Sequence, residues 1–400
     1  MTPGSRALAS GVTAGLVVAV SLPAAAVDVN QSYAVARTVV LRGHGFGHGH
    51  GMSQYGAQGA AKQGLTYKQI IDFYYPSTTW SQVTGKVRVL ISADTTSDVV
   101  VAAVPGLRLT DIGAAKTYTL PTPKGVKRWR ITVGAGNRSV VDYLTGSWHR
   151  WKPDGRAALV GDGQFGAPTP MTLFTPAGAR SYRGSLRSAS PVRGGKARDT
   201  VNVLSMDDYV RGVIPREMPA SWQPEAVKAQ AVAARTYATW SREQFPTRYY
   251  QICDTSYCQV YGGAGAEDPR SNAAVTATAN QILTFDGKPA FAQFSSSSGG
   301  WTSAGSVPYL TAKADPYDDY DGNPVHAWST ELGATRIERA YPGVGTLRGI
   351  DVTRRDGNGD WKGRVWTLVL DGTKNDVTVS GDAFRARFGL RSSWFTVVTR

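Results

Sequence analysis

The sequence predicts an α+β fold that is rich in strands and divided into several lobes. Short runs of Val, Thr, Arg and Tyr alternate with glycines, of which the chain has 45, and this pattern is typical of strands joined by tight turns. One long alanine-rich segment, which begins at 221–224 and ends near residue 244, has high helix propensity. Roughly 370 residues follow the N-terminal leader, which is more than one ordinary domain contains. We therefore expect two or three lobes.

The N-terminal residues predict export. Arg6 precedes an apolar run at 7–20, and Pro23 with the alanines that end at Ala26 forms a small-residue cleavage site. Residues 1–26 therefore fit a secretory signal peptide. The alternative is an uncleaved membrane anchor, but the run is shorter than the ~20 residues of a spanning helix. No later segment is apolar enough to span a bilayer, so we expect a secreted protein of the cell wall or extracellular envelope.

The charge balance is strongly basic. Lys and Arg number 44 against 30 Asp and Glu, which gives a formal net charge of +14. A field of that sign attracts anionic polymers. No basic run with interleaved aromatic residues stands out, so we expect no nucleic-acid partner. Affinity for the cell wall and a generic solvated basic surface explain the charge equally well.

Patterning divides the chain after the leader. Residues 38–80 form a Gly/His-rich N-terminal motif segment, residues 85–345 the main domain, and residues 346–400 a C-terminal β-rich part of the same domain. Besides the alanine-rich helix, the predicted helices lie at 53–62, 66–74, 270–280 and 382–388. The predicted strands include 86–92, 128–133, 181–187, 200–205, 282–285 and 290–294.

Glu217 is the best catalytic candidate. Pro215 and Pro219 bracket it just before the alanine-rich helix and restrict the backbone on both sides. The apolar neighbours Met218 and Trp222 can exclude water from its carboxyl group, which raises the pKa as a general acid requires. The structural alternative is a salt bridge from Glu217 to an arginine such as Arg211 or Arg216.

The alanine-rich helix carries two cations on nearly one face. Lys228 and Arg235 are seven residues apart in the sequence, which brings them to the same side after two turns. They are suited to hold substrate carboxylates or acetamido oxygens. Alternatively both side chains extend to solvent, or Lys228 pairs with Glu225 three residues earlier.

The run from Ser295 to Gly300 supplies hydroxyls and backbone amides that suit sugar hydroxyls. By itself such a run indicates only a loop. No Ser-His-Asp arrangement can be argued from the sequence, which speaks against a serine hydrolase.

His44, His48 and His50 alternate with glycines. In an extended strand these three imidazoles share a face, because even numbers of residues separate them, and they could then hold zinc. The simpler explanation is that the glycines let the backbone pass close to other segments. We therefore predict no cofactor, with zinc at these histidines as the alternative.

Cys253 and Cys258 are the two cysteines of the chain. In an exported protein they are expected to form a disulfide that closes a small loop. Zinc binding is the alternative, but it needs further ligands, and residues 254–257 contain no histidine.

Three separated stretches, 212–219 with the helix that follows, 294–301 and 43–56, together resemble the SpoIID/LytB family of cell-wall proteins. Its members include stage II sporulation protein D-like and amidase enhancer LytB-like proteins, and they remodel peptidoglycan. The resemblance implies a SpoIID-like fold whose alanine-rich helix lies beside the active groove. Some members bind zinc near the cysteine motif, where this chain has Tyr257 instead of the expected histidine. Our candidate substrate-binding residues are Arg211, Lys228, Gln230, Arg235, Ser296, Ser298 and Gly299.

The resemblance implies a lytic transglycosylase that cleaves peptidoglycan glycan strands with Glu217 as both acid and base. The first alternative is a non-enzymatic glycan-binding enhancer of a cell-wall amidase, which would then be a second partner. A further alternative is a histidine-based metallo-amidase. The Gly/His motif at 43–56 lies near the C-terminus of the domain in some family members, whereas it precedes the domain here.

Overall fold

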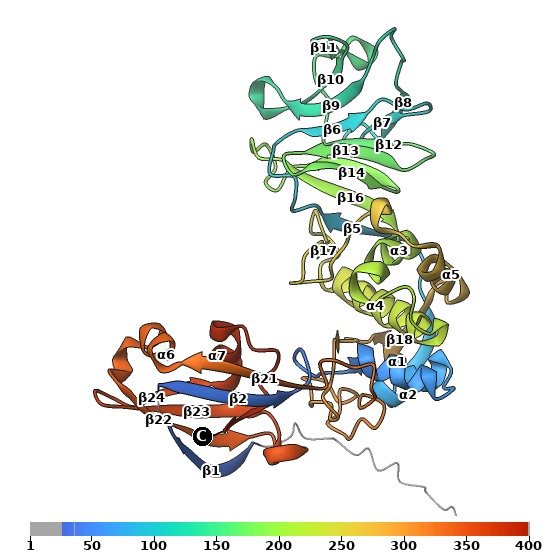
Figure 1. The fold of residues 1–400 in the computed structure, drawn as a ribbon. Coiled ribbons are helices and arrows are strands. Elements are labelled where there is room, and N and C mark those ends of the chain that lie inside the picture. The colour runs from blue at the N-terminus through green and yellow to red at the C-terminus, as the bar shows by residue number, and fades with distance from the viewer. Residues whose placement is uncertain (1–25, 36, 399–400) are drawn as a thin grey trace, which may run out of the picture.

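The computed structural model describes residues 26–35 and 37–398, so the signal peptide expected at 1–26 lies almost wholly outside the described residues. Figure 1 shows a β-rich lobe at the top, a layer of helices below it, and a second β-rich lobe to one side. We call these parts the sheet lobe, the helical layer and the terminal lobe. The mixed α+β class predicted from the sequence is confirmed. None of the helices in the described part of the chain is long and apolar enough to cross a membrane.

The sheet lobe contains two mainly antiparallel sheets. One has six strands in the order β11-β10-β9-β6-β13-β14, and the other has seven in the order β17-β5-β16-β15-β12-β7-β8. Their bounds are β5 Lys86–Leu90, β6 Val99–Ala102, β7 Arg108–Asp111, β8 Lys116–Thr119, β9 Arg128–Val133, β10 Ser139–Leu144, β11 Trp148–Trp151, β12 Gly163–Gly166, β13 Met171–Thr175, β14 Gly178–Tyr182, β15 Ser185–Ala189, β16 Asp199–Ser205 and β17 Ile252–Cys253.

Two strand predictions need correction. The strand expected at 181–187 is divided between β14 and β15, which belong to different sheets. Gly184 makes this break with a φ of +74°, and a Cβ there would lie 2.5 Å from the Val203 carbonyl oxygen. The strand expected at 290–294 is reduced to a two-residue strand, β20 Phe294–Ser295.

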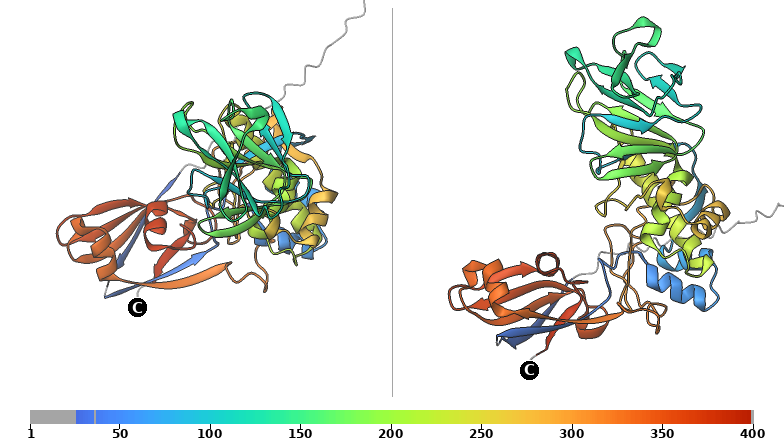
Figure 2. Two further views of the ribbon diagram at one scale, coloured as in Figure 1. Left: turned by 90° about the horizontal axis from the view of Figure 1, so that it is seen from above. Right: turned by 45° about the horizontal axis from the view of Figure 1, so that its top comes forward.

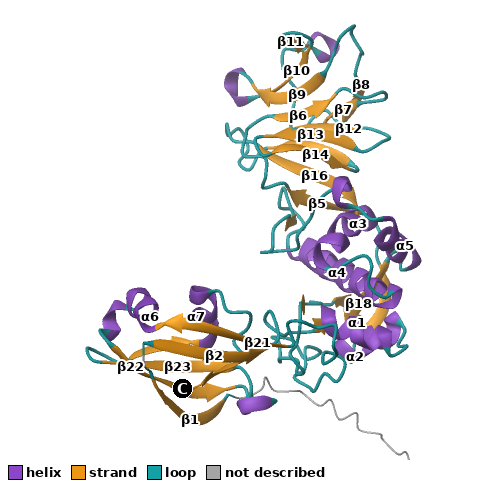
Figure 3. Ribbon diagram, in the orientation of Figure 1, coloured by secondary structure: helices purple, strands orange, loops and turns teal. Residues whose placement is uncertain are grey.

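The helical layer is built around the alanine-rich helix, α4. Its alanines are small enough for α1, α2, α3 and α5 to pack closely around it, and most of them are fully buried. Figure 3 shows α1 to α5 gathered in this layer between the two β-rich lobes. The helices are α1 Gln54–Lys62, α2 Tyr67–Tyr74, α3 Met206–Glu217, α4 Pro224–Gln244 and α5 Pro269–Ala277. Short strands β3 Met52–Ser53, β4 Thr79–Gln82, β18 Gln281–Phe285, β19 Lys288–Pro289 and β20 complete the layer.

The predicted helices at 53–62 and 66–74 are confirmed as α1 and α2. Ser53 caps α1 by accepting a hydrogen bond from the Gly56 amide, and Thr66 forms a capping box with Gln69 at the start of α2.

Helix α3 was not predicted. Ser205 caps its start, and Gly212 within it is packed so closely against Tyr261 that a Cβ would lie 2.5 Å from the ring. Glu217 is therefore the last residue of one helix, rather than a residue of an extended segment before the next. Pro215 lies within the last turn of α3, and the helix ends two residues after it.

The terminal lobe combines both ends of the chain. Strand β2 Thr38–His44 pairs with β21 Ala327–Gly333 and with β25 Phe395–Val398, while β1 Val27–Ala34 pairs with β22 Leu347–Arg355. The remaining elements are α6 Ala334–Ala340, β23 Val365–Gly372, β24 Val377–Ser380 and α7 Gly381–Phe388.

This lobe has a hydrophobic core of its own, separate from the one that the sheet lobe and the helical layer share. Residues 346–400 were predicted to belong to the same domain as 85–345, and the described part of this stretch, 346–398, shares this core with residues of 27–44 and 327–344. Figure 2 shows the blue N-terminal strands among the orange and red C-terminal ones in both views. Residues 45–51 then lead from this lobe to the helical layer.

Candidate functional site

The Gly/His segment, residues 44–51, is not an extended strand. Strand β2 ends at His44, and Gly45, Gly47, Gly49 and Gly51 all have left-handed φ values between +67° and +112°, a region that glycine enters readily. The expectation that His44, His48 and His50 share one face is therefore wrong. His44 contacts Trp361 and Trp394 of the terminal lobe, while His48 and His50 stack on each other with ring centroids 5.0 Å apart.

The serine loop, residues 295–303, lies against the Gly/His segment. The amide of Phe46 donates to the Ser297 carbonyl at 2.9 Å, and the Ser297 amide donates back at 3.0 Å. The Ser303 amide donates to the Gly49 carbonyl at 2.8 Å. Two of the three motifs that carried the family resemblance are thus held together by backbone hydrogen bonds.

Two buried aspartates, Asp315 and Asp318, hold the serine loop in place by hydrogen bonds. Asp318 accepts hydrogen bonds from the hydroxyls of Ser53 at 2.5 Å and Ser297 at 2.7 Å and from the Gly299 amide at 3.0 Å. Asp315 accepts from the Ser298 hydroxyl at 2.8 Å. The Ser298 hydroxyl and the Gly299 amide therefore stabilise the conformation of the loop. Ser296 is half-buried, and its carbonyl accepts from the Tyr55 amide.

Glu217 lies in a cavity of about 280 Å³. The other lining residues come from the Gly/His segment, from α4, from the 256–260 loop and from the segment before the serine loop: His48, Tyr237, Ser256, Tyr257, Cys258, Val260, Gln293 and Phe294. Ser296, Ser298 and Gly299 are outside this lining. Aromatic rings and a carboxyl group in one concave site form the usual composition of a binding pocket for a small ligand or a polymer segment.

The carboxyl group of Glu217 is held in place without a cation. Its Oε1 atom accepts a hydrogen bond from the Val260 amide at 3.1 Å. Burial raises the pKa of Glu217, while hydrogen bonds from the Val260 amide and the Gln54 side chain partly oppose this rise. Within the described residues, no lysine or arginine nitrogen lies within ion-pairing distance of Glu217. Arg211 pairs instead with Asp208 at 2.7 Å, so the salt-bridge alternative does not hold.

The expected row of cations on α4 does not line this cavity. Arg235 is fully buried, and its Nε atom lies 2.7 Å from Asp207 of α3. Its other donors reach the carbonyl oxygens of Val275 at 3.3 Å and Gln281 at 3.2 Å. Lys228 pairs with Glu225 at 2.6 Å. Because α4 is surrounded by other helices, Arg235 joins elements of the helical layer, and the expectation of a shared cationic face toward a groove is wrong.

Gln230 is fully buried and accepts a hydrogen bond from the side chain of Gln54 at 3.5 Å. Since Gln54 also bonds to Glu217, Gln230 is connected to the site through one intermediate residue. Sequence reasoning missed Gln54, although it belongs to the Gly/His motif at 43–56 and its position there was the available signal.

Cys253 and Cys258 form the predicted disulfide, with Cα atoms 5.5 Å apart. The bridge closes the loop that carries Tyr257, whose side chain is 92% exposed at the edge of the cavity. Because both sulfurs are bonded to each other, neither supplies a thiolate for zinc. Over residues 26–35 and 37–398, no three His, Cys, Asp or Glu side chains are grouped so that they could hold a metal ion.

A family profile described as SpoIID, Stage II sporulation protein, matches residues 195–285, which include α3, α4 and Glu217. A protein named amidase enhancer from Bacillus subtilis (strain 168) is 41% identical over 135 residues, which are 32% of this chain and 17% of that protein.

Two proteins named Stage II sporulation protein D are similar over a longer stretch. The one from Bacillus amyloliquefaciens is 31% identical over 224 residues, 49% of this chain and 61% of the relative. The one from Bacillus subtilis (strain 168) is 35% identical over 224 residues, 50% of this chain and 62% of the relative. The chain thus spans less than two thirds of the length of each of these curated relatives.

Proposed function

We propose that the chain, which matches the SpoIID family profile through the region that contains Glu217, is an exported lytic transglycosylase that cleaves the glycan strands of peptidoglycan. The observation that carries this proposal is the half-enclosed carboxyl group of Glu217, whose pKa is raised by burial. A carboxyl group of this kind can keep its proton until a glycosidic oxygen is placed beside it.

In the proposed reaction, Glu217 donates its proton to the glycosidic oxygen as the bond to the sugar C1 atom breaks. The leaving strand departs with a new hydroxyl group. The Glu217 carboxylate then accepts the proton of the C6 hydroxyl on the remaining sugar, and that oxygen bonds to C1 to close an anhydro ring. No water is consumed, and Glu217 ends the cycle protonated as it began.

The composition of the cavity favours a mechanism with one carboxylate. Glycosidases that hydrolyse their substrate normally place a second Asp or Glu across the scissile bond. Among the described residues that line the cavity, Glu217 is the sole carboxylic acid. Tyr237, Tyr257 and Phe294 offer ring faces for sugar stacking, and Gln293 and Ser256 offer hydrogen bonds.

The other candidate residues take supporting roles in this proposal. Gln230 holds Gln54 beside Glu217, and Arg235 ties α4 to α3. Arg211 pairs with Asp208 and Lys228 with Glu225, and neither these residues nor the serine loop line the cavity. The formal charge of +14 favours retention at the anionic cell wall after export.

A second candidate function is that of a non-enzymatic enhancer of a cell-wall amidase. The relative named amidase enhancer, with 41% identity over 135 residues, is the observation that favours it. In that case the cavity binds a glycan strand, Glu217 transfers no proton, and the partner is an amidase.

Product analysis separates these two functions. Purified glycan strands, with and without peptides, are incubated with the chain and with Glu217→Gln, and the products are examined by mass spectrometry. The proposal expects anhydro-ended fragments from the unmutated protein alone. If both proteins bind the strands and neither releases fragments, the enzyme proposal is wrong, and stimulation of an amidase becomes the activity to measure.

A further inference from the structure

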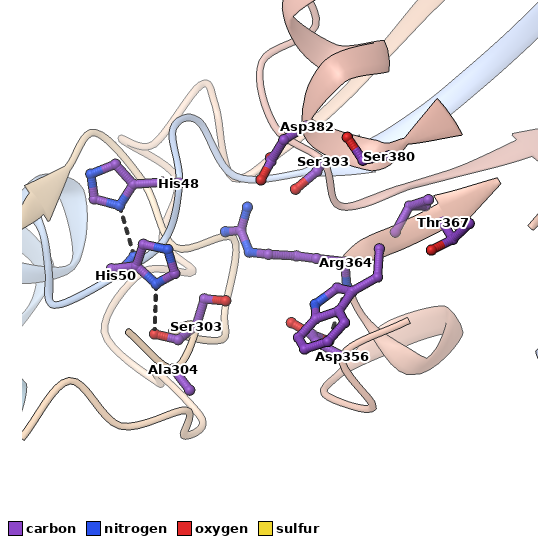
Figure 4. A pocket seen from close by; sticks show the side chains of 12 residues that line it. His48, His50, Ser303, Ala304, Asp356, Arg364, Thr367, Ser380, Asp382 and Ser393 are labelled. Carbon is purple, nitrogen blue, oxygen red and sulfur yellow. Dashed lines mark hydrogen bonds between the residues drawn. The ribbon is translucent and has the colours of Figure 1, made fainter. Parts of the chain in front are cut away.

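A second cavity shares the residue His48 with the Glu217 site. It has a volume of about 360 Å³ and is formed where the Gly/His segment and the serine loop meet the terminal lobe. Figure 4 shows His48, His50, Ser303 and Ala304 on one side of it and Asp356, Thr367 and Ser393 on the other. His48 lines both cavities, so the two cavities are neighbours that share this residue.

Arg364 immediately precedes β23, and its side chain extends into this cavity. Its guanidinium group lies beside His50 and Asp382 in Figure 4, and the residue is only 4% exposed. Its Nη1 atom donates to the Gly47 carbonyl at 3.2 Å, and its Nη2 atom donates to the Ser298 carbonyl at 3.4 Å. Both hydrogen bonds are long and both acceptors are neutral. No carboxylate in the described chain lies within ion-pairing distance of this guanidinium.

Neither acidic residue of the cavity forms an ion pair with Arg364, although the charges of Asp356 and Asp382 both help to keep its guanidinium protonated. The Oδ1 atom of Asp356 accepts from the backbone amides of Arg364 at 3.0 Å and Asn358 at 3.1 Å. Asp382 lies in the first turn of α7, where the helix dipole stabilises a negative charge. A buried cation without an ion pair at close range is costly, so the guanidinium is suited to an anion that enters the cavity.

The remaining walls of the cavity are suited to a carboxylate on a larger polar ligand. The hydroxyl groups of Ser303, Thr367 and Ser393 suit amide or sugar groups next to the carboxylate. The imidazole of His48 accepts a hydrogen bond from the His50 amide through Nδ1 at 3.0 Å, which fixes its tautomer and leaves it neutral. Arginine binds carboxylates through two parallel hydrogen bonds, which gives both strength and orientation.

We propose that this cavity, centred on Arg364, is a subsite for a carboxylate of the same wall ligand that enters the Glu217 cavity. In peptidoglycan such a carboxylate is either the lactyl group of muramic acid without its peptide or a carboxylate of the short peptide attached there. The inference rests on the proposed function for the identity of the ligand. It adds that the terminal lobe takes part in substrate binding.

Binding measurements on uncleaved ligands test the subsite. Three probes of equal glycan length are titrated by calorimetry into the full chain carrying Glu217→Gln: neutral chitotetraose, a tetrasaccharide with free muramic lactyl groups, and the same tetrasaccharide with a dipeptide on each lactyl group. At least one acidic probe is expected to bind roughly tenfold more tightly than chitotetraose. A charge-assisted hydrogen-bonded pair between its carboxylate and the Arg364 guanidinium provides affinity of this size. Which acidic probe binds more tightly identifies the source of the carboxylate.

Controls separate the subsite from the general basic charge of the surface. Ala304→Trp fills the cavity from a partly exposed loop position, whereas Thr378→Trp adds the same ring at an exposed position on β24 outside the cavity. The preference for acidic probes is expected to vanish in Ala304→Trp and to persist in Thr378→Trp. Because Arg364→Gln removes a buried side chain that also holds Gly47, its binding is interpreted only if its Tm is unchanged.

Two results overturn the inference. One is equal affinity for all three probes of the Glu217→Gln chain that has no further substitution. The other is an undiminished preference for the acidic probes when a folded Ala304→Trp variant is measured. The test does not depend on catalysis. If the acidic preference is present but the unmutated chain makes no anhydro products, the subsite stands and the transglycosylase proposal fails. If the products form without any acidic preference, the reverse holds.

Discussion

The backbone amide of Val260 donates a hydrogen bond to Glu217 Oε1 at 3.1 Å. This contact joins the end of α3 to the loop that follows the disulfide. The two residues, Glu217 and Val260, are 43 positions apart in the sequence. It leaves Glu217 oriented by a neutral donor. A cation in the same place would stabilise the ionised carboxylate and lower its pKa, whereas burial among apolar neighbours raises it.

The first prediction concerns the pH dependence of glycan cleavage. Glu217 must be protonated to act as an acid, and its pKa is raised, so activity should persist above the ordinary glutamate range and fall as pH rises through the folded pKa. Glu217→Gln should reduce cleavage by at least about 100-fold. Initial rates measured across pH with a defined glycan test both statements. Glu243→Gln, at an exposed position near the end of α4, is the matched control and should leave the profile unchanged.

The same residue predicts a change in stability. A carboxyl group whose folded pKa is raised contributes stability below its unfolded pKa and loses that contribution as pH rises through the folded value. Glu217→Gln should therefore raise the Tm at neutral pH relative to the unmutated protein, and the gain should disappear under acidic conditions. Thermal unfolding at both pH values measures it. A Tm gain that is the same at both pH values would contradict the burial of an ionisable group here.

Asp318 should be essential for the stability of the serine loop. Burial disfavours its charge, but hydrogen bonds from His326, Ser53 and Ser297 outweigh burial and lower the pKa of Asp318. Asp318→Ala removes the acceptor for several buried donors and should cost about 3 kcal/mol of unfolding free energy. The cost should fall as pH drops through the lowered pKa, because a depressed carboxyl pKa stabilises the fold only above it.

Chemical denaturation of Asp318→Ala against Asp319→Ala measures this cost. Asp319 is the adjacent residue, its side chain is 76% exposed, and it lies 3.7 Å from the same histidine, His326. An exposed pair of this kind contributes less than about 1 kcal/mol. Equal losses in the two variants would show that the buried network does not stabilise the loop.

The two cations of α4 should differ sharply when each is replaced by methionine. Arg235→Met removes the fully buried partner of the partly buried Asp207 carboxylate and should cost about 3–5 kcal/mol. Lys228→Met breaks a partly exposed pair with Glu225 and should cost less than about 1 kcal/mol. Urea denaturation compares them. If Lys228→Met instead weakens glycan binding with no loss of stability, the substrate role first expected for this residue regains support.

Local patterns predicted most of the helical layer, because the capping residues of α1 and α2 and the alanine content of α4 act over a few residues. Helix α3 was missed because Gly212 and Pro215 disfavour a helix locally, and only packing against Tyr261 explains the glycine. For the same reason Glu217 was identified but its surroundings were not. Its neighbours Met218 and Trp222 suggested burial, whereas the cavity walls come from residues such as Tyr237 and Phe294 that only the fold brings together.

The segments without periodicity could not be assigned from sequence. Asp315 and Asp318 lie in a long loop and give no local signal of their role, which depends on Ser53 and the serine loop far away in sequence. The pairing of β2 with β21 and β25 likewise joins the two ends of the chain. Sequence patterns span only a few neighbouring residues, so they cannot show that strands far apart in the sequence pair with each other.

The last prediction tests why the Gly/His segment needs its glycines. Gly49 has a φ of +78°, and a Cβ there would lie 2.3 Å from Nη2 of Arg364. Gly64 has a similar φ of +89°, and a Cβ there would have no atom within 4 Å. Gly49→Ala and Gly64→Ala therefore share the backbone strain, roughly 1–2 kcal/mol, while only Gly49→Ala also displaces the guanidinium. We expect Gly49→Ala to be the more destabilising in thermal unfolding and to abolish any carboxylate preference, whereas Gly64→Ala keeps it. Equal effects would mean that the close approach of Arg364 to the segment contributes nothing.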